Sequence, residues 1–266
     1  MNRTGLLLAL AAAVIGGAIF GFYPQLDISI SRALSPTAIG FPRPTASMDF
    51  IRDLCSLIIG GLAAVGFVAI ALKLILPLRP MIVPARAAVL LIVTIALGPG
   101  LMTNVILKDN WGRARPYAVK EFGGPEKFTP WWDPRGACTG NCSFIAGEPS
   151  GAFWTLAPAA VLAPPQWRVA AYGAAVAFGV GVGVARIAFG AHFASDVLFA
   201  GVLTFLLIWL VHGLLYRFAA TRISESKLEA IIGGVTRPLW TLVSPPARGR
   251  KRLKKKRPAR RKARRP

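Results

Sequence analysis

The chain has little charge for its length, and that deficit excludes an ordinary soluble fold. Charged residues make up 16% of the 266 residues, and hydrophobic residues make up 54%. Soluble globular domains carry about 25% charged residues. A helix needs about 20 mostly apolar residues to cross a bilayer. Six stretches qualify: roughly 5–22, 54–77, 85–107, 149–165, 167–190 and 193–216. We therefore expect an all-α fold, a polytopic membrane bundle of six transmembrane helices, in one domain over residues 1–218.

Histidine and cysteine are scarce as well. The chain has two histidines and three cysteines, and no histidine lies near Cys138 or Cys142. The predicted outer face also lacks a cluster of carboxylates that could hold a divalent ion. We therefore expect no metal and no cofactor. Cys138 and Cys142 share one outer loop, where an oxidising compartment permits a disulfide, and one sequence does not decide between that bond and two free thiols.

Acidic residues are also few, which leaves a net charge of +21. Thirteen of the 32 lysines and arginines lie between Arg248 and Arg265, in a self-repelling run typical of disorder. This run has no interleaved aromatic residues, so we read it as a topology signal and expect no nucleic-acid partner. Residues 219–266 are then a cytoplasmic segment, with an amphipathic helix around 227–242 before the basic disordered tail.

The distribution of lysine and arginine predicts the orientation of the spans. The positive-inside rule places both termini in the cytoplasm, so the outer segments are 23–53, 108–148 and the turn near 190. The second outer segment holds Lys108, Arg113 and Arg115. Cations on the outer side break the rule, so we expect them to have a function.

Three polar stretches meet at this predicted outer face: KDNWGRARP from Lys108, CSFIAGEPSGAFW from Cys142, and ARIAFGAHFASD from Ala185. His192 and Asp196 are four residues apart, so on a helix they would share one face. Asp196 could then accept the proton of one imidazole nitrogen and leave the other nitrogen as a nucleophile. Three cations could neutralise a phosphate there: Lys108, Arg115 and Arg186.

These motifs resemble the type 2 phosphatidic acid phosphatase superfamily, whose pattern is K-x6-RP, PSGH and SR-x5-H-x3-D. The first motif is complete, and the third lacks only its first serine, replaced by Ala185; the resemblance covers about 84–216. It implies that His192 is the nucleophile and Asp196 its orienting partner. It also implies three phosphate ligands: Lys108, Arg115 and Arg186.

The second motif departs from the family pattern, because the histidine that protonates the leaving oxygen is missing. One frame aligns PSGH with residues 145–148, which places Gly147 in the phosphate-binding set and Glu148 at the position of the acid. The other frame aligns it with residues 149–152. We prefer the first frame, since Pro149 suits the first turn of a helix. His212 cannot replace the missing histidine, because twenty helical residues separate it from His192 by about 30 Å. The missing acid is therefore Glu148, water or nothing.

The resemblance implies a metal-independent lipid phosphatase in a bacterial inner (plasma) membrane, with its site facing the periplasm and a phosphohistidine intermediate. Lipid A, undecaprenyl diphosphate and phosphatidylglycerol phosphate are the substrate classes that it suggests, and the partners are this phosphorylated lipid and the bilayer. The altered second motif keeps an alternative open, a catalytically impaired member that binds phospholipid. The oligomeric state stays open.

Overall fold

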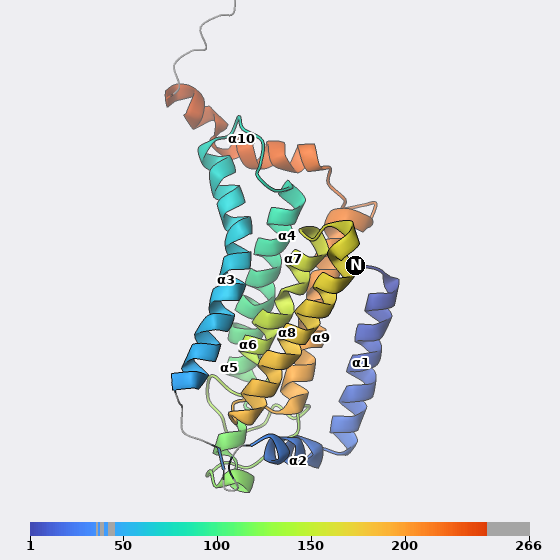
Figure 1. Ribbon diagram of the computed structural model, residues 1–266, viewed down its shortest axis with the longest axis vertical. Helices are drawn as coiled ribbons and strands as arrows, with labels where there is room; N and C mark the ends of the chain where they lie inside the picture. Colours follow the sequence, from blue (N-terminus) through green and yellow to red (C-terminus); the bar gives the residue numbers. More distant parts are fainter. Residues whose placement is uncertain (36, 38–39, 42–45, 244–266) are drawn as a thin grey trace, which may run out of the picture.

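The computed structural model describes residues 1–35, 37, 40–41 and 46–243, which form an elongated helical bundle (Figure 1). Helices make up the regular elements of these described residues, and strands do not occur among them. The expected all-α class is therefore confirmed. The basic tail from Arg248 lies outside the described residues.

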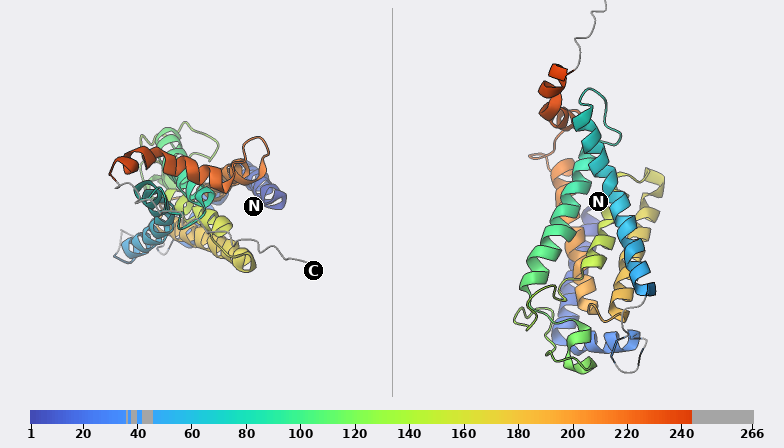
Figure 2. Two further views of the ribbon diagram at one scale, coloured as in Figure 1. Left: turned by 90° about the horizontal axis from the view of Figure 1, so that it is seen from above. Right: turned by 90° about the vertical axis from the view of Figure 1, so that its left-hand side faces the viewer.

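Five helices of the described chain are long and apolar enough to cross a membrane. The first is α1 (Arg3–Phe22), which stands at one side of the bundle, and the second is within α3 (Ala46–Ile75) (Figures 1 and 2). The third joins three consecutive helical pieces: α4 (Ala85–Ile95), the π-helix η1 (Ala96–Leu107) and α5 (Lys108–Asn110). The last two follow the 3₁₀ turn η4 (Pro165–Trp167): α8 (Arg168–Ala188), and α9 (Ala194–His212) with the π-helical turn η5 (Gly213–Arg217).

The expected count of six spans is not confirmed, because the fourth stretch forms two short helices. They are α6 (Gly147–Trp154) and α7 (Leu156–Val161), and they meet at Thr155. Pro158 has no N–H to donate to the carbonyl of Trp154, which favours a break at this point. The pair is enclosed by the other helices, and Trp154 is fully buried. Hydroxyl contacts tie α6 inside the bundle, since Ser150 Oγ lies 3.0 Å from Thr103 Oγ1.

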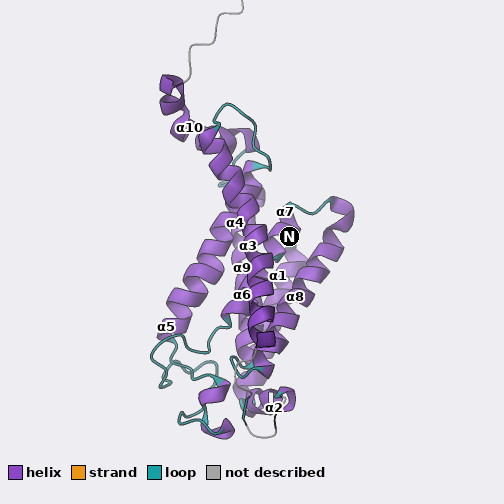
Figure 3. Cartoon of the chain, turned by 60° about the vertical axis from the view of Figure 1, so that its left-hand side comes forward, coloured by secondary structure: helices purple, strands orange, loops and turns teal. Residues whose placement is uncertain are grey.

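The connections from α1 to α3, from α5 to α6 and from α8 to α9 gather at one end of the bundle (Figure 1). α2 (Gln25–Leu34) crosses this end below α1, and the loops of residues 111–146 lie beside it (Figures 1 and 3). Two 3₁₀ turns occur within these loops: η2 (Pro116–Ala118) and η3 (Lys120–Phe122). The turn between α8 and α9 opens onto the same end, so residues distant in the sequence meet there.

The opposite end is closed by α10 (Glu225–Val243), which lies across the ends of α3 and α4 (Figure 1). Glu229 accepts a hydrogen bond of 2.8 Å from Lys73, and Glu225 accepts one of 2.8 Å from Arg86. A helix therefore does occupy the segment around 227–242. These two ion pairs fix it to the bundle at the end away from His192.

Candidate active site

His192 lies in the tight turn between α8 and α9. The chain reverses at Gly190, whose φ of +69° is the left-handed conformation that favours glycine. A Cβ at this position would also overlap the ring of Phe41. The turn brings Arg186, in the last turn of α8, and His192 to the same end of the bundle.

The imidazole of His192 is fully buried, and its two nitrogens have different surroundings. Nδ1 lies 2.8 Å from the backbone carbonyl oxygen of Ser143. A carbonyl oxygen only accepts, so Nδ1 carries the proton. Nε2 then has a free lone pair, and no hydrogen-bond partner for it occurs among the described residues. Burial is the largest cause that holds the pKa of His192 well below its ordinary value, and the next causes are the charges of Arg115, Lys108 and Arg186. The ring is therefore neutral at neutral pH.

Asp196 does not contact the imidazole in the way that the sequence pattern predicts. α9 begins only at Ala194, so His192 precedes the helix and does not share its face with Asp196. The carboxylate turns back to the start of α9, where Oδ2 accepts hydrogen bonds from the Phe193 N–H at 2.8 Å and the Ser143 hydroxyl at 2.5 Å. The expected direct contact between Asp196 and the His192 imidazole is therefore not present. Instead, Asp196 accepts a hydrogen bond from the Ser143 hydroxyl, and the Ser143 carbonyl orients His192.

The three predicted phosphate ligands converge on His192 from separate elements: Lys108 from α5, Arg115 from the following loop, and Arg186 from α8. Arg115 is held by Asn141, whose side-chain oxygen accepts from Nη2 at 2.7 Å. The positive charges of all three side chains act on the imidazole. The structure therefore brings together the cations that the sequence places in two separate motifs.

Gly147 and Glu148 belong to the same cluster, which supports the preferred frame of the second motif. An ideal Cβ on Gly147 would lie 2.6 Å from Lys108 Nζ, so the backbone here closely approaches that ammonium. Glu148 Oε1 lies 3.4 Å from Arg186, and its Oε2 lies 4.0 Å from the free Nε2 of His192. In the other frame Ser150 would take a site position, but it is buried among the hydroxyls of the bundle interior. α6 begins at Gly147, and the first N–H groups of a helix lack partners within it.

A cavity of about 390 Å³ adjoins this cluster at the end of α3 and α8. A narrower crevice of about 10 Å³ shares its Arg186 wall and reaches Glu148. Both charged and apolar side chains line the larger cavity: Phe41, Met48, Asp49, Arg52, Arg115, Tyr117, Arg186, Phe189 and Ala191. The site can thus receive an anionic group attached to an apolar body.

The family assignment follows from residues 87–220, which match the model of the PAP2 superfamily. This match covers the cations, Gly147, Glu148, His192 and Asp196. The chain belongs to the PAP2 superfamily.

Two similar proteins carry a more specific name. A lipid A 4'-phosphatase from Francisella tularensis subsp. novicida is 39% identical over 132 residues, which are 50% of this chain and 60% of that protein. One from Rhizobium leguminosarum is 38% identical over 104 residues, 39% of this chain and 44% of that protein. The chain thus aligns with about half of the length of these relatives. No solved structure matches it.

The PAP2 motif region is braced by a disulfide in the loop between α5 and α6. Cys138 and Cys142 are bonded, with their Cα atoms 5.8 Å apart. The Cys142 N–H donates to the Lys108 carbonyl oxygen at 3.0 Å, and the Cys138 N–H donates to the Gly112 carbonyl oxygen at 3.0 Å. The bond therefore fixes the loop against the backbone of the first motif.

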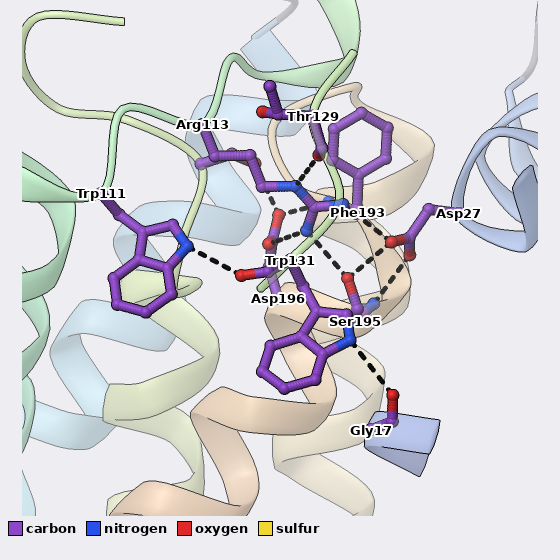
Figure 4. A network of polar contacts seen from close by, with 10 residues as sticks. Gly17, Asp27, Trp111, Arg113, Thr129, Trp131, Phe193, Ser195 and Asp196 are labelled. Atoms are coloured by element: carbon purple, nitrogen blue, oxygen red, sulfur yellow. Dashed lines mark hydrogen bonds and ion pairs between the residues drawn. The ribbon is translucent and has the colours of Figure 1, made fainter. Parts of the chain in front are cut away.

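The sequence pattern misses residues behind the PAP2 site that only the fold assembles (Figure 4). Arg113 is fully buried and lies between two carboxylates, those of Asp27 and Asp196. The sequence predicts Arg113 only as one of several outer-loop cations, and it does not single out Asp27. A buried arginine is rarely left without a partner, but no local signal indicates which acid supplies it.

Proposed function

We propose that this protein is a membrane lipid phosphatase that hydrolyses a phosphate monoester of a lipid A-like glycolipid through a phosphohistidine at His192. The observation that carries the proposal is the free Nε2 of a buried, neutral His192 beside three cations and one carboxyl group. The names of the relatives favour lipid A over the isoprenyl diphosphate and phosphatidylglycerol phosphate classes.

The first chemical step is attack of the His192 Nε2 lone pair on phosphorus. An N–P bond forms, and the bond between phosphorus and the lipid oxygen breaks with its electron pair on that oxygen. The proton on Nδ1 stays hydrogen-bonded to the Ser143 carbonyl, which favours the imidazolium that develops. Three cations would hold the non-bridging oxygens and offset the charge of the transition state: Lys108, Arg115 and Arg186.

Glu148 is the proposed acid that transfers a proton to the leaving group. In its protonated form it gives this proton to the lipid oxygen, which leaves as an alcohol. The resulting carboxylate then takes a proton from a water molecule as that water attacks the phosphohistidine, and inorganic phosphate is released with His192 restored. The carboxyl group of Glu148 lies between Arg186 and His192 Nε2, and this position supports its roles as general acid and then as general base.

The cavity between α3 and α8 supports the proposal that the substrate is a lipid. Its apolar wall includes Met48 and Phe189, and the crevice beneath it continues along α3 to Ile51. An acyl chain could therefore remain beside the spans while the phosphate reaches His192. The three cations do not need a metal ion to neutralise a dianionic phosphate, so the proposed reaction is metal-independent.

The site is proposed to face the periplasm of a bacterial inner membrane. The end with α10 carries the inner loops that the distribution of lysine and arginine assigns to the cytoplasm. The site lies at the other end, together with the disulfide of Cys138 and Cys142, which suits an oxidising compartment.

The proposal is tested by measuring phosphate release from lipid A, an isoprenyl diphosphate and phosphatidylglycerol phosphate with the purified protein in mixed micelles. We expect the fastest release from lipid A. His192→Ala should abolish release while the thermal unfolding temperature of the protein stays close to that of the wild type. His212→Ala is the matched control. The ring of His212, at the end of α9, stacks on that of Tyr216 in η5, so it lies at the other end of this span from His192. Turnover by His192→Ala at the wild-type rate would reject the phosphohistidine.

A second candidate is a catalytically impaired member that binds phospholipid, and the missing histidine of the second motif is the observation that favours it. Glu148 stands where that histidine would donate a proton. This candidate predicts binding of phosphorylated lipid without phosphate release from any member of the panel. Release that depends on His192 would exclude it.

A further inference from the structure

Behind the proposed nucleophile lies a fully buried polar network that starts outside the family region (Figure 4). Arg113 is its centre: Nη2 donates to Asp27 Oδ2 at 2.8 Å, and Nη1 donates to Asp196 Oδ1 and, at 2.8 Å, to Ser195 Oγ. All four side chains are at most 1% exposed. A guanidinium has five donors in a rigid planar fork, so it can hold two carboxylates in fixed positions at once.

The network continues from Arg113 to the imidazole without a gap. Asp196 Oδ2 accepts from the Ser143 hydroxyl at 2.5 Å, and the Ser143 carbonyl lies 2.8 Å from His192 Nδ1. The Ser143 N–H also donates to the Arg113 carbonyl at 2.8 Å. Ser143 is therefore held on both sides, and a shift of either Arg113 or Asp196 would move the oxygen that orients the nucleophile.

Asp27 anchors the far side of the network. Oδ1 accepts from the Ser195 N–H at 2.9 Å, and Oδ2 accepts from the Ser195 hydroxyl at 2.6 Å as well as from Arg113. Asp27 lies in α2, before the family region of residues 87–220, so the motifs do not include it. Asp27 and Asp196 thus hold the Arg113 guanidinium from two sides, which keeps Asp196 in a fixed position behind Ser143.

The packing around Arg113 prevents it from adopting other positions. Its guanidinium lies 4.5 Å from the ring centroid of Phe193 and 5.5 Å from that of Phe128. Nε donates to the Thr129 carbonyl oxygen at 2.9 Å. These hydrogen bonds and the two aromatic rings fix the Arg113 side chain. A displacement of Asp27 in α2 would therefore also displace Asp196 through Arg113.

We infer that Asp27 and Arg113 are positioning residues for the nucleophile, so that α2 completes an active site whose other parts lie within the family region. This inference rests on the proposed function. Asp27 touches neither the imidazole nor the cations of the phosphate site. Its loss should therefore lower the rate of the chemical step and leave phosphate binding intact.

The test compares Asp27→Asn with the wild type on lipid A in mixed micelles. The amide keeps the shape of the carboxyl group but places an NH₂ donor either against the Ser195 N–H, at Oδ1, or against both Arg113 and the Ser195 hydroxyl, at Oδ2. We expect kcat to fall by about 10–100-fold, because a small displacement of a reacting group has an effect of this size. KM and competitive inhibition by inorganic phosphate should stay within about twofold, since the cations that bind phosphate are untouched.

Asp133→Asn is the matched control. Asp133 also pairs with an arginine in an outer loop, Arg135 at 2.8 Å, but neither residue contacts the network or the site. Its kcat should equal that of the wild type. If Asp27 had a merely structural role, Asp27→Asn would raise KM and weaken phosphate inhibition as well as lower kcat. That result would overturn the inference.

Ser195→Ala decides the case if Asp27→Asn does not fold. It removes only the hydroxyl between Arg113 and Asp27 and keeps every charge. A several-fold lower kcat with unchanged phosphate inhibition supports the inference, and wild-type kcat overturns it. Failure of the wild type to release phosphate from any lipid would reject the proposed function and the inference with it. Wild-type release that is unaffected by Asp27→Asn would reject the inference alone.

Discussion

The free Nε2 of His192 and a carboxyl oxygen of Glu148 lie 4.0 Å apart. The distance is too long for a hydrogen bond, but it is short enough for the carboxyl group to reach an oxygen on a phosphorus atom bound to Nε2. Glu148 thus lies beside the proposed nucleophile, although 44 positions separate the two residues in the sequence. This relationship makes the role of the substituted second-motif residue testable.

Glu148→Gln should separate substrates by their leaving groups. Glutamine keeps the size of the side chain but cannot donate the carboxyl proton. General acid catalysis contributes about 10²–10⁴-fold, so hydrolysis of a lipid phosphomonoester should slow by at least about 100-fold. p-Nitrophenyl phosphate, whose leaving group needs no proton, should be hydrolysed at nearly the wild-type rate. Equal slowing of both substrates would show that Glu148 positions the phosphate and does not protonate the leaving oxygen.

The pH dependence should lack a loss of activity near the ordinary pKa of histidine. Burial, and then the neighbouring cations, hold the pKa of His192 well below its usual range. The imidazole of His192 therefore stays neutral as the pH falls through about 6.5, where a solvated imidazole would take up a proton. A profile of kcat/KM for wild-type protein should place any acidic limb due to His192 well below that pH. A limb centred at the ordinary value would contradict the buried, neutral state.

The same lowered pKa has a consequence for stability. Below about pH 6.5 the unfolded state binds a proton at His192 that the folded state does not bind, so stability falls as the pH decreases. The loss continues until the pH passes through the lowered pKa of the folded state. Thermal unfolding of His192→Ala should show a weaker decrease between neutral and acidic pH than the wild type. Identical pH dependences would indicate that His192 titrates normally in the folded protein.

Chelation should leave the activity unchanged. Groups of three or more histidine, cysteine or carboxylate side chains suited to a metal do not occur within the described residues. Fixed cations can neutralise the phosphate instead, so we expect wild-type rates of phosphate release after dialysis against EDTA. Vanadate should inhibit competitively, because it occupies the same oxyanion site. Loss of activity on chelation, with recovery after addition of magnesium, would reject the metal-independent reaction.

Gly147→Ala should weaken the phosphate site without unfolding the protein. The added methyl group would lie 2.6 Å from Lys108 Nζ and 3.1 Å from its Cε, so the end of this flexible side chain must move. We expect kcat/KM to fall by about 10-fold or more, since a displaced charge stabilises the transition state less well. Gly181→Ala in α8 is the control, because nothing lies within 4 Å of its ideal Cβ. Unchanged kcat/KM for Gly147→Ala would show that Lys108 does not need this close approach.

The helical class and the residues of two motifs can be predicted from the sequence alone. Long apolar runs specify membrane helices because the bilayer offers no hydrogen-bond partners to an open backbone. Lys108 and Arg115 lie seven positions apart at the end of one span, and Arg186 and His192 lie six positions apart across one turn. Because these spacings are local, the sequence alone is sufficient to predict the four residues as members of one candidate site.

The contacts that these residues make depend on how the helices pack. The apolar run of 149–165 did not predict the break at Thr155. A count of hydrophobic residues measures the length of the run, but it does not take into account that Pro158 has no N–H to donate. The spacing of His192 and Asp196 predicted a direct pair, but the helix begins after His192 and the Ser143 carbonyl takes that place. Asp27 reaches Ser195 across 168 positions of sequence. Contacts of that range depend on how the helices pack, and no local pattern of residues encodes them.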